Sequence, residues 1–428
     1  MQDNTTGTPQ KNHVITPKST LSFYNLQYRL ENGEYVVWRI GDDDFYVLPE
    51  EGKRAIELLK TGMPVEKVQK ILDEEYDAQI DLTGFITSLL NTNLLSAFDG
   101  YDLPEKTYKK NSLPWITKTH AGWFLSKYAL MLYGIVFFAG IGTLISHIPL
   151  FPQWSDFFWA PSTSLVLLVN ICIGFGFVAL HELAHLFTAR ALGIPGRISF
   201  GTRLHYLVMQ TDVTGIWSAP KNKRYIVYLS GIFCNLLFAS VFIILLSYIP
   251  FSPLITGILK MALLTNILVI VGEFELYMRT DLYFVLMDFL RCRNLFHDSL
   301  SYARYVLNRM IGFTGLRKRK LNNPLLHLPH HERRSIQVYS LIAVIGSIVS
   351  LGIFAFYSVP IALRLYETAV ISLVSGYSEG KLIHFIDGSV TLLVEVLFIG
   401  LYIYAFVKNH PRIIAFVTAN VLPFRKRR

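Results

Sequence analysis

Charged residues are scarce in this chain. Asp, Glu, Lys and Arg make up 17% of its 428 residues, against about 25% in a typical soluble protein. The shortfall is uneven, because residues 1–127 have an ordinary soluble composition while residues 128–408 contain several long apolar runs. A run of about 20 apolar residues can cross the hydrocarbon core of a bilayer. The composition therefore excludes a soluble enzyme and a disordered tail for most of the chain, and predicts an integral membrane protein.

Cysteine is also rare. The chain has 3 cysteines, and none lies in a CxxC pattern. This excludes a disulfide framework and a zinc site built from thiolates. The N-terminal sequence MQDNTTGTPQKNH is polar and lacks the apolar stretch of a cleavable signal peptide. We therefore expect the part before the first apolar run to stay in the cytoplasm.

The basic residues are placed where they orient a membrane protein. The net charge is +9, but Lys and Arg gather at the ends of the apolar runs, so the charge does not indicate nucleic-acid binding. Six membrane spans are expected, at about 127–148, 164–192, 225–249, 254–278, 335–363 and 389–407. Basic stretches at 106–127, 190–224 and 279–334 lie on one side of these spans. The protein is thus predicted to be a multi-pass cell-membrane protein with both termini in the cytoplasm.

The soluble N-terminal part has a pattern of its own. Residues 35–49 alternate as two short strands around an acidic turn, and helices are expected at 50–60, 64–76 and 82–95. These elements predict a small α+β domain of winged-helix type. The expected organisation is a disordered N-terminus (1–24), this domain (25–100), a basic linker (101–126), a catalytic membrane core (127–300), a basic cytoplasmic loop (301–334), and a C-terminal pair of spans with a basic tail (335–428).

The second span contains the sequence His181-Glu182-Leu183-Ala184-His185, an HExxH pattern. Residues four apart lie above one another on a helix, so both imidazoles can reach one metal ion, and Glu182 can face the same cleft and hold a water. Ionisable groups inside an apolar helix are costly unless they are paired or bound to a metal. The pattern therefore predicts a site for one Zn²⁺ ion.

A tetrahedral zinc site with an open position needs a third protein ligand. The end of the fourth span, GEFELYMRTDLYFVLMD, offers the carboxylates Glu273, Glu275, Asp281 and Asp288. Spacing alone does not choose among them, and each can equally be a solvated or arginine-paired carboxylate.

These residues resemble the site-2 protease family of intramembrane zinc metallopeptidases. The resemblance rests on HELAH, on TDVTGIWSAPKNKRYIVYLSGIFCNLLFAS with its Gly231 and Asn235, and on MRTDLYFVLMDFLRCRNL. It implies that Asp281 is the third zinc ligand and that Asp288 is structural. The chain has Leu282 where the family has glycine and lacks the Asn-Pro before the aspartate, which leaves room for a degenerate enzyme.

The N-terminal domain is similar to PqqD-like domains, which bind the leader peptides of ribosomally made, modified peptides. The likeness rests on FYVLPEEGKRAIELLKTGMPVEKVQKIL and FITSLLNTNLL. It implies that a peptide adds as a strand to an exposed sheet edge. It also implies a bacterial origin, and a peptide exporter or modifying enzyme as a partner.

The expected function is hydrolysis of a peptide bond near the cytoplasmic membrane face, in the maturation, export or signalling of such a peptide. His181, His185 and Asp281 would hold zinc and Glu182 would act as general base. The substrate would be a peptide or membrane protein, with membrane lipid as the surroundings. The alternative is a catalytically degenerate recruitment or export partner. A transporter is a weaker alternative, because the sequence has no repeated halves.

Overall fold

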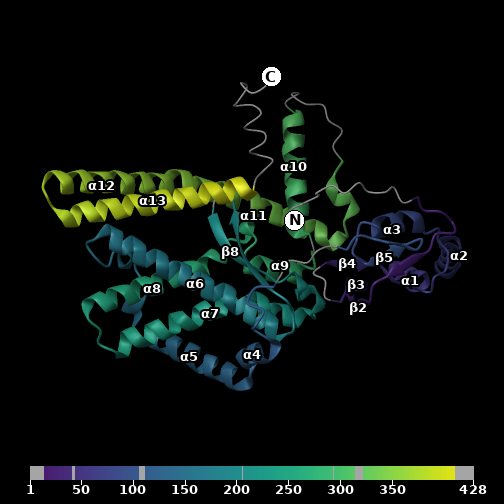
Figure 1. Ribbon diagram of the computed structural model, residues 1–428, viewed down its shortest axis with the longest axis horizontal. Coiled ribbons are helices and arrows are strands. Elements are labelled where there is room, and N and C mark those ends of the chain that lie inside the picture. The colour runs from purple at the N-terminus through teal and green to yellow at the C-terminus, as the bar shows by residue number, and fades with distance from the viewer. Residues whose placement is uncertain are drawn as a thin grey trace. The chain divides into compact units, whose positions relative to one another are not determined.

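The computed structural model describes residues 14–40, 44–105, 111–204, 206–292, 294–313 and 322–409 (Figure 1). The first part of the predicted disordered N-terminus, the acidic turn at 41–43 and the basic tail lie outside the described residues. The chain forms two compact units. The N-terminal unit comprises residues 1–111 and 214–220, and the helical unit comprises residues 112–213 and 221–428.

The N-terminal unit combines two antiparallel sheets of three strands with three helices. The sheets have the orders β1(Leu21–Phe23)-β5(Leu95–Phe98)-β6(Tyr101–Asp102) and β2(Leu26–Glu31)-β3(Glu34–Arg39)-β4(Phe45–Leu48). The helices are α1(Glu50–Lys60), α2(Val65–Tyr76) and α3(Leu82–Leu89). The predicted strand pair and the first two helices are therefore confirmed.

Local sequence explains the boundaries of these elements. Asn32 and Gly33 both have positive φ, as a two-residue hairpin between β2 and β3 requires. Gly62, with φ +80°, follows the end of α1, and the Asp81 side chain caps α3 by accepting from the Gly84 backbone N–H. Side chains from the helices and the sheets bury a common core, which includes Val37, Ile56, Leu59, Val68, Leu72, Leu82 and Ile86.

Three predicted boundaries of this unit were wrong. The ordered part begins before residue 25, because β1 pairs with β5 and buries Leu21. The third helix ends at Leu89 rather than near residue 95, since Leu95 enters β5 and is 2% exposed. The predicted linker 101–126 contributes β6 and, in the helical unit, α4(Lys118–Gly122).

Residues 214–220 belong to the N-terminal unit although they lie far along the chain. They form a short 3-10 helix at Thr214–Ser218, in which Ile216 is 3% exposed. The backbone carbonyl of Trp217 accepts a hydrogen bond from the Arg29 guanidinium at 2.9 Å. The sequence predicts this segment to be part of the membrane core. It was missed because long-range contacts, rather than a local pattern, hold it.

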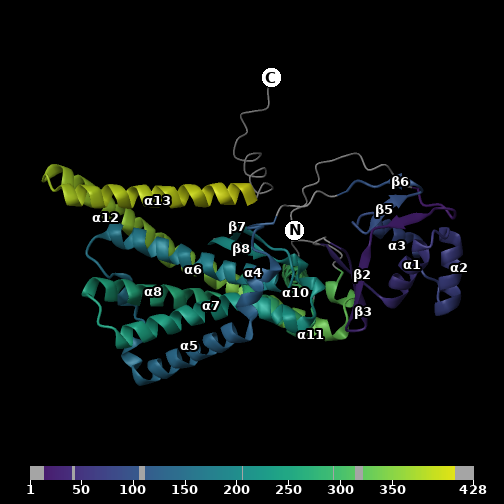
Figure 2. The ribbon, with the colours of Figure 1, turned by 60° about the horizontal axis from the view of Figure 1, so that its bottom comes forward.

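The helical unit contains six helices that are long and apolar enough to cross a membrane. They are α5(Lys127–Ser146), α6(Thr163–Ala191), α7(Lys221–Tyr248), α8(Pro253–Gly272), the continuous helix His330–Ser378, and α13(Leu382–Asn409). Besides α4 and several short 3-10 helices, this unit also contains the hairpin β7(Arg197–Arg203)-β8(Tyr206–Asp212), α9(Asp281–Leu290) and α10(Leu295–Phe313). Figure 2 shows α5, α7, α8 and α6 side by side. The architecture is consistent with a multi-pass membrane protein.

The last two spans are longer than predicted. Helix α11(His330–Ile353) continues through a π-helical turn at Phe354–Ser358 into α12(Val359–Ser378). Pro360 has no backbone N–H to donate to the preceding turn, which accounts for the local change of hydrogen bonding. Helix α13 then packs against α12, with Gly388 against the backbone of Ala369 and Leu373. The predicted loop 301–334 likewise contains most of α10 and the start of α11.

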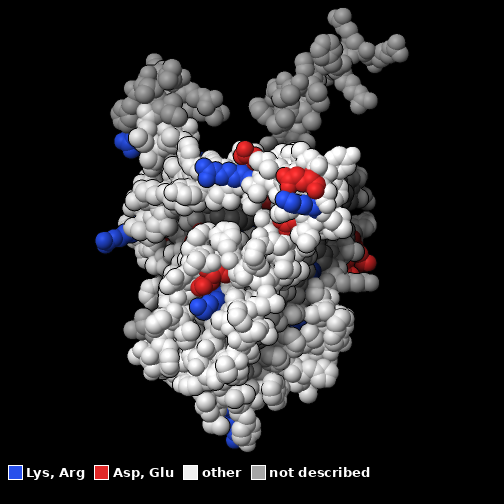
Figure 3. Space-filling view, turned by 90° about the vertical axis from the view of Figure 1, so that its left-hand side faces the viewer, with Lys and Arg blue, Asp and Glu red and all other residues white. Residues whose placement is uncertain are grey.

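Aromatic side chains mark both ends of α5. Trp123 and Tyr128 are 64% and 69% exposed near its start, and Phe151 and Trp154 are 60% and 65% exposed beyond its end. A helix of 20 residues is about 30 Å long, the thickness of the hydrocarbon core. Tryptophan and tyrosine prefer the two membrane interfaces. Figure 3 shows that uncharged residues dominate the surface of the molecule seen from the left of Figure 1, as contact with lipid requires.

Candidate metal centre

Helix α6 brings His181 and His185 together. Both side chains are buried, at 3% and 5% exposure. They lie four residues apart and therefore stand above one another, with their Nε2 atoms 3.1 Å apart. The spacing read from the sequence thus produces the expected pair of imidazoles.

Asp281, at the first turn of α9, completes the cluster. Its Oδ2 atom lies 2.9 Å from Nε2 of His181 and 2.7 Å from Nε2 of His185. The three ligand atoms all lie within 4.8 Å of one another. Among the four candidate carboxylates, Asp281 is the one that meets both histidines, although it is 100 residues away from His181 in the sequence.

The other three candidates have different surroundings. Glu273 Oε1 lies 3.7 Å from His181 Nε2, at the edge of the cluster. The Glu275 carboxylate accepts a hydrogen bond from the Tyr277 side chain. Asp288 forms an ion pair with Arg224 at 3.2 Å. The structural role that the resemblance implied for Asp288 agrees with this pairing.

The hydrogen bonds of His185 orient its ring for metal binding. Its Nδ1 atom lies 2.8 Å from the backbone carbonyl oxygen of Val227 on α7. A carbonyl oxygen can only accept, so Nδ1 carries the proton and Nε2 presents its lone pair to the cluster. This is the usual arrangement of a zinc-binding histidine.

Asn235 lies against the Nδ1 atom of the other histidine, His181. Its amide nitrogen Nδ2 lies 3.1 Å from His181 Nδ1, and its Oδ1 atom is buried and has no hydrogen-bond partner among the described residues. With the amide group turned over, Oδ1 accepts a hydrogen bond from Nδ1–H, which leaves His181 Nε2 free to bind a metal. The buried Asn266 amide donates to the Asn235 backbone carbonyl at 2.6 Å and fixes this turn of α7.

Gly231 makes the space at the centre of the cluster. A Cβ atom at this position would lie 2.4 Å from His181 Nε2 and 2.5 Å from His185 Nε2. Both distances are far shorter than a van der Waals contact. The lack of a side chain at Gly231 therefore keeps both ligand nitrogens unobstructed on this side, where any larger residue would clash with them.

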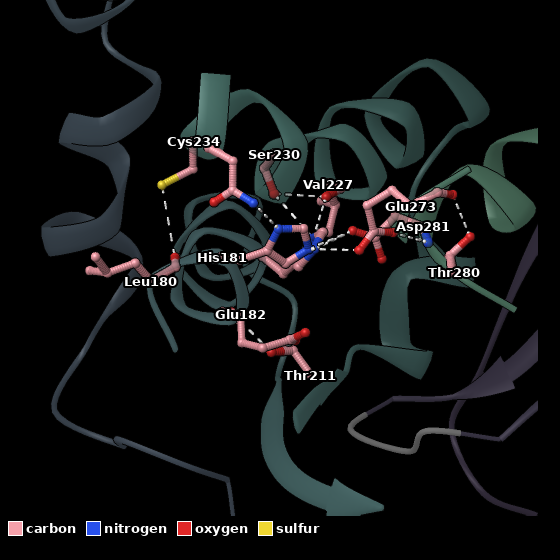
Figure 4. Close-up of polar contacts among 12 residues, drawn as sticks. Leu180, His181, Glu182, Thr211, Val227, Ser230, Cys234, Glu273, Thr280 and Asp281 are labelled. Atoms are coloured by element: carbon pink, nitrogen blue, oxygen red, sulfur yellow. Dashed lines mark hydrogen bonds and ion pairs between the residues drawn. The ribbon is translucent and has the colours of Figure 1, made fainter. Parts of the chain in front are cut away.

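Glu182 does not point directly at the ligand atoms. It is half-buried, and Figure 4 shows its side chain on the side of α6 that faces Thr211 of β8. The Thr211 hydroxyl donates to the Glu182 backbone carbonyl at 2.9 Å. Within the described part of the chain, the Glu182 carboxylate makes no hydrogen bond or ion pair, although it is close enough to His185 to interact with it electrostatically. A water molecule or substrate group is needed to connect it to the cluster.

A buried ion pair holds α9, and with it Asp281, against α7. Arg224 and Asp288 are 0% and 7% exposed, and the Arg224 Nε atom faces Asp288 Oδ2. Removing one member of such a pair leaves an uncompensated buried charge, which typically costs about 3–5 kcal/mol.

We expect Arg224→Met to lower the unfolding free energy by about 3 kcal/mol and to reduce metal content through displacement of α9. Adding Asp288→Asn in the same chain should recover more than half of the loss, because no buried charge is then left alone. Thermal unfolding in detergent, followed by tryptophan fluorescence, measures both variants. An Arg224→Met protein as stable as wild type would contradict this role of the pair.

The donor set is chemically suited to zinc. Two imidazole nitrogens and one carboxylate oxygen form a ligand set that zinc enzymes use, and three protein ligands leave a fourth position open. Comparison of the chain with protein-family models, curated proteins and solved structures found no match. The interpretation of the cluster therefore rests on its own geometry.

Proposed function

We propose that the chain is an intramembrane zinc metalloprotease that hydrolyses a peptide bond near the cytoplasmic membrane face. The observation that carries the proposal is the meeting of His181, His185 and Asp281 from two separate helices. The open space at Gly231 and the oriented ring nitrogens support it. Zinc bound there would lower the pKa of a water ligand to about 7 and polarise the scissile carbonyl.

Four residues of the chain would have two different roles in the reaction. His181, His185 and Asp281 would hold the metal. Glu182, on the next position of α6 after His181, would take a proton from the attacking water and later give it to the leaving amine. Its direction toward β8 places this acid–base group between the metal cluster and the hairpin.

The hairpin offers a way to present substrate. Peptide carbonyls within a transmembrane helix are already hydrogen-bonded, so a substrate must unwind before cleavage. Strands β7 and β8 pair with each other, and in the described part of the chain neither strand has a second neighbour. Because Thr211 of β8 touches Glu182, an extended substrate added to this hairpin would lie beside the catalytic carboxylate.

The depth of the site supports the cytoplasmic assignment. His181 lies about 27 Å along α6 from its start at Thr163, close to the full thickness of the hydrocarbon core. The loop before Thr163 carries no Lys or Arg between 149 and 162, whereas 190–224 is rich in both. By the positive-inside rule the basic side is cytoplasmic, and both termini lie there too.

The N-terminal unit would recruit the substrate. Its two small sheets have unpaired outer strands within the described residues, which supports binding of an extended leader peptide in the manner of PqqD-like domains. Holding a ribosomally made peptide near the membrane would raise its local concentration at the metal centre. In this role the protein would act in the maturation, export or signalling of a bacterial peptide. Its partner would be a peptide exporter or a modifying enzyme.

Zinc content tests the proposal. We expect the detergent-purified wild type to retain one zinc ion per chain after mild chelation and Asp281→Ala to lose it, because two imidazoles alone bind zinc weakly. Metal analysis measures both, with Glu367→Ala, which removes an exposed carboxylate of α12, as the control that should keep its zinc. A folded wild-type protein that takes up no zinc would overturn the proposal.

A second candidate function keeps the fold without the catalysis. Leu282 follows Asp281 where site-2 proteases have glycine, and the Asn-Pro that precedes the aspartate in those proteins is missing. Both observations favour a degenerate recruitment or export partner for a modified peptide. Such a protein would bind the leader peptide, with any zinc serving as a structural ion, and would release no cleavage product.

A further inference from the structure

Glu273 joins the end of α8 to the start of α9. Its Oε2 atom accepts a hydrogen bond from the backbone N–H of Asp281 at 2.8 Å. The Thr280 hydroxyl donates to the Glu273 backbone carbonyl at 2.6 Å. These two bonds close the turn at 274–279, in which Arg279 has a left-handed backbone. The first residue of α9, which carries the ligand oxygen, is therefore fixed from α8.

The second carboxylate oxygen of Glu273 faces the cluster. Its Oε1 atom lies 3.7 Å from His181 Nε2, and its side chain is 16% exposed. Two neutral imidazoles and one carboxylate leave a divalent ion with a net positive charge, which is costly in a poorly solvated site. A second carboxylate at this distance neutralises that charge. Glu273 is not one of the three residues whose ligand atoms cluster together, so it acts from outside the three-ligand set.

We infer that Glu273 is a positioning residue of the metal centre. Oε2 holds Asp281 in place, and Oε1 supplies the negative charge that balances the bound ion. This inference rests on the proposed zinc site and adds a fourth residue to it. A simple helix cap would need the hydrogen bond to Asp281 alone, so the charge on Glu273 separates the two roles.

The chain offers a matched control at Glu275. This residue lies two positions further along, and its carboxylate bonds to Tyr277. Glu275→Gln therefore makes the same change of charge and size close by in the sequence. Glu273→Gln keeps an oxygen that accepts the Asp281 N–H, so it removes the charge and leaves the cap in place.

The test is the dissociation constant for Zn²⁺, measured by competition with a fluorescent chelator on the full chain in detergent. We expect Glu273→Gln to weaken zinc binding about 10- to 100-fold, as mutations around metal ligands commonly do. The melting temperature of the metal-free protein should stay at the wild-type value, and Glu275→Gln should match wild type in both measurements.

Three results would overturn the inference, and each is distinct from failure of the proposed function. Wild-type zinc affinity and melting temperature in Glu273→Gln would show that the charge has no effect. A lowered melting temperature with unchanged affinity would make Glu273 a helix cap only. Equal weakening in both variants would indicate a general effect of surface charge. If the wild type itself bound no zinc, the proposed function would fail first.

Discussion

A Gly231→Ala variant will bind no zinc at concentrations that saturate the wild type. The added Cβ would lie 2.4 and 2.5 Å from the two ligand nitrogens, a separation that real Cβ atoms essentially never show. The imidazoles cannot easily move away, because Val227 and Asn235 hold their other nitrogens. Metal analysis after purification measures the effect, and any proteolytic activity should disappear with the metal.

The control for this experiment is Gly176→Ala on α6, one turn and a half before His181. A Cβ at Gly176 meets nothing within 4 Å, so zinc content should not change. Alanine favours helix over glycine by about 1 kcal/mol, so neither variant should lose helicity by circular dichroism. Wild-type zinc content in a folded Gly231→Ala protein would show that the two Nε2 atoms are not the ligands.

Glu182→Gln should strongly slow peptide cleavage and leave zinc content unchanged. The amide cannot accept the proton of the attacking water, and loss of a general base typically costs 10²- to 10⁴-fold in rate, so a decrease of about 1,000-fold is expected. Glu182 is not among the three ligand residues, which is why the metal should stay. Mass spectrometry can find peptides that are produced in cells expressing the wild type and not in cells expressing Asp281→Ala. These products identify the substrate, which is then used in single-turnover measurements.

Glu367→Gln is the matched control, because Glu367 is an exposed carboxylate on α12. It should leave both cleavage and zinc content at wild-type values. Cleavage that persists in Glu182→Gln would assign the base to another group. Absence of any product in the wild type, with zinc bound, would favour the recruitment partner over the protease.

Local periodicity predicted the parts of the site that lie on one helix. The pair His181 and His185 follows from the helical repeat alone, and the structure places them as that repeat requires. For the third ligand, the spacing left four candidate carboxylates, of which Asp281 is one. Which of them turns inward depends on the link at 274–279 and on the contact between Glu273 and Asp281, and neither leaves a periodic signal.

Contacts between distant segments account for the errors. Strand β5 and the segment 214–220 both looked like parts of neighbouring elements, because their own residues do not reveal the partner. Leu95 leaves the helix for a strand because β1 is there to pair with it. The long helix His330–Ser378 was cut short in the prediction, since Arg364 and Glu367 interrupt its apolar run.

Because residues 214–220 belong to the N-terminal unit, they also determine when during synthesis that unit can be completed. The N-terminal unit requires a segment that the ribosome makes about 100 residues after residue 111. At roughly 5–20 residues per second, this part arrives about 5 to 20 s later, after both α5 and α6 have been translated. During that interval the N-terminal unit lacks residues 214–220, including the side chain of Ile216 that is buried in the complete unit. The N-terminal unit is thus completed only after α6, which carries His181 and His185, has been synthesised. A nascent chain that stalled between residues 111 and 214 would leave both units incomplete.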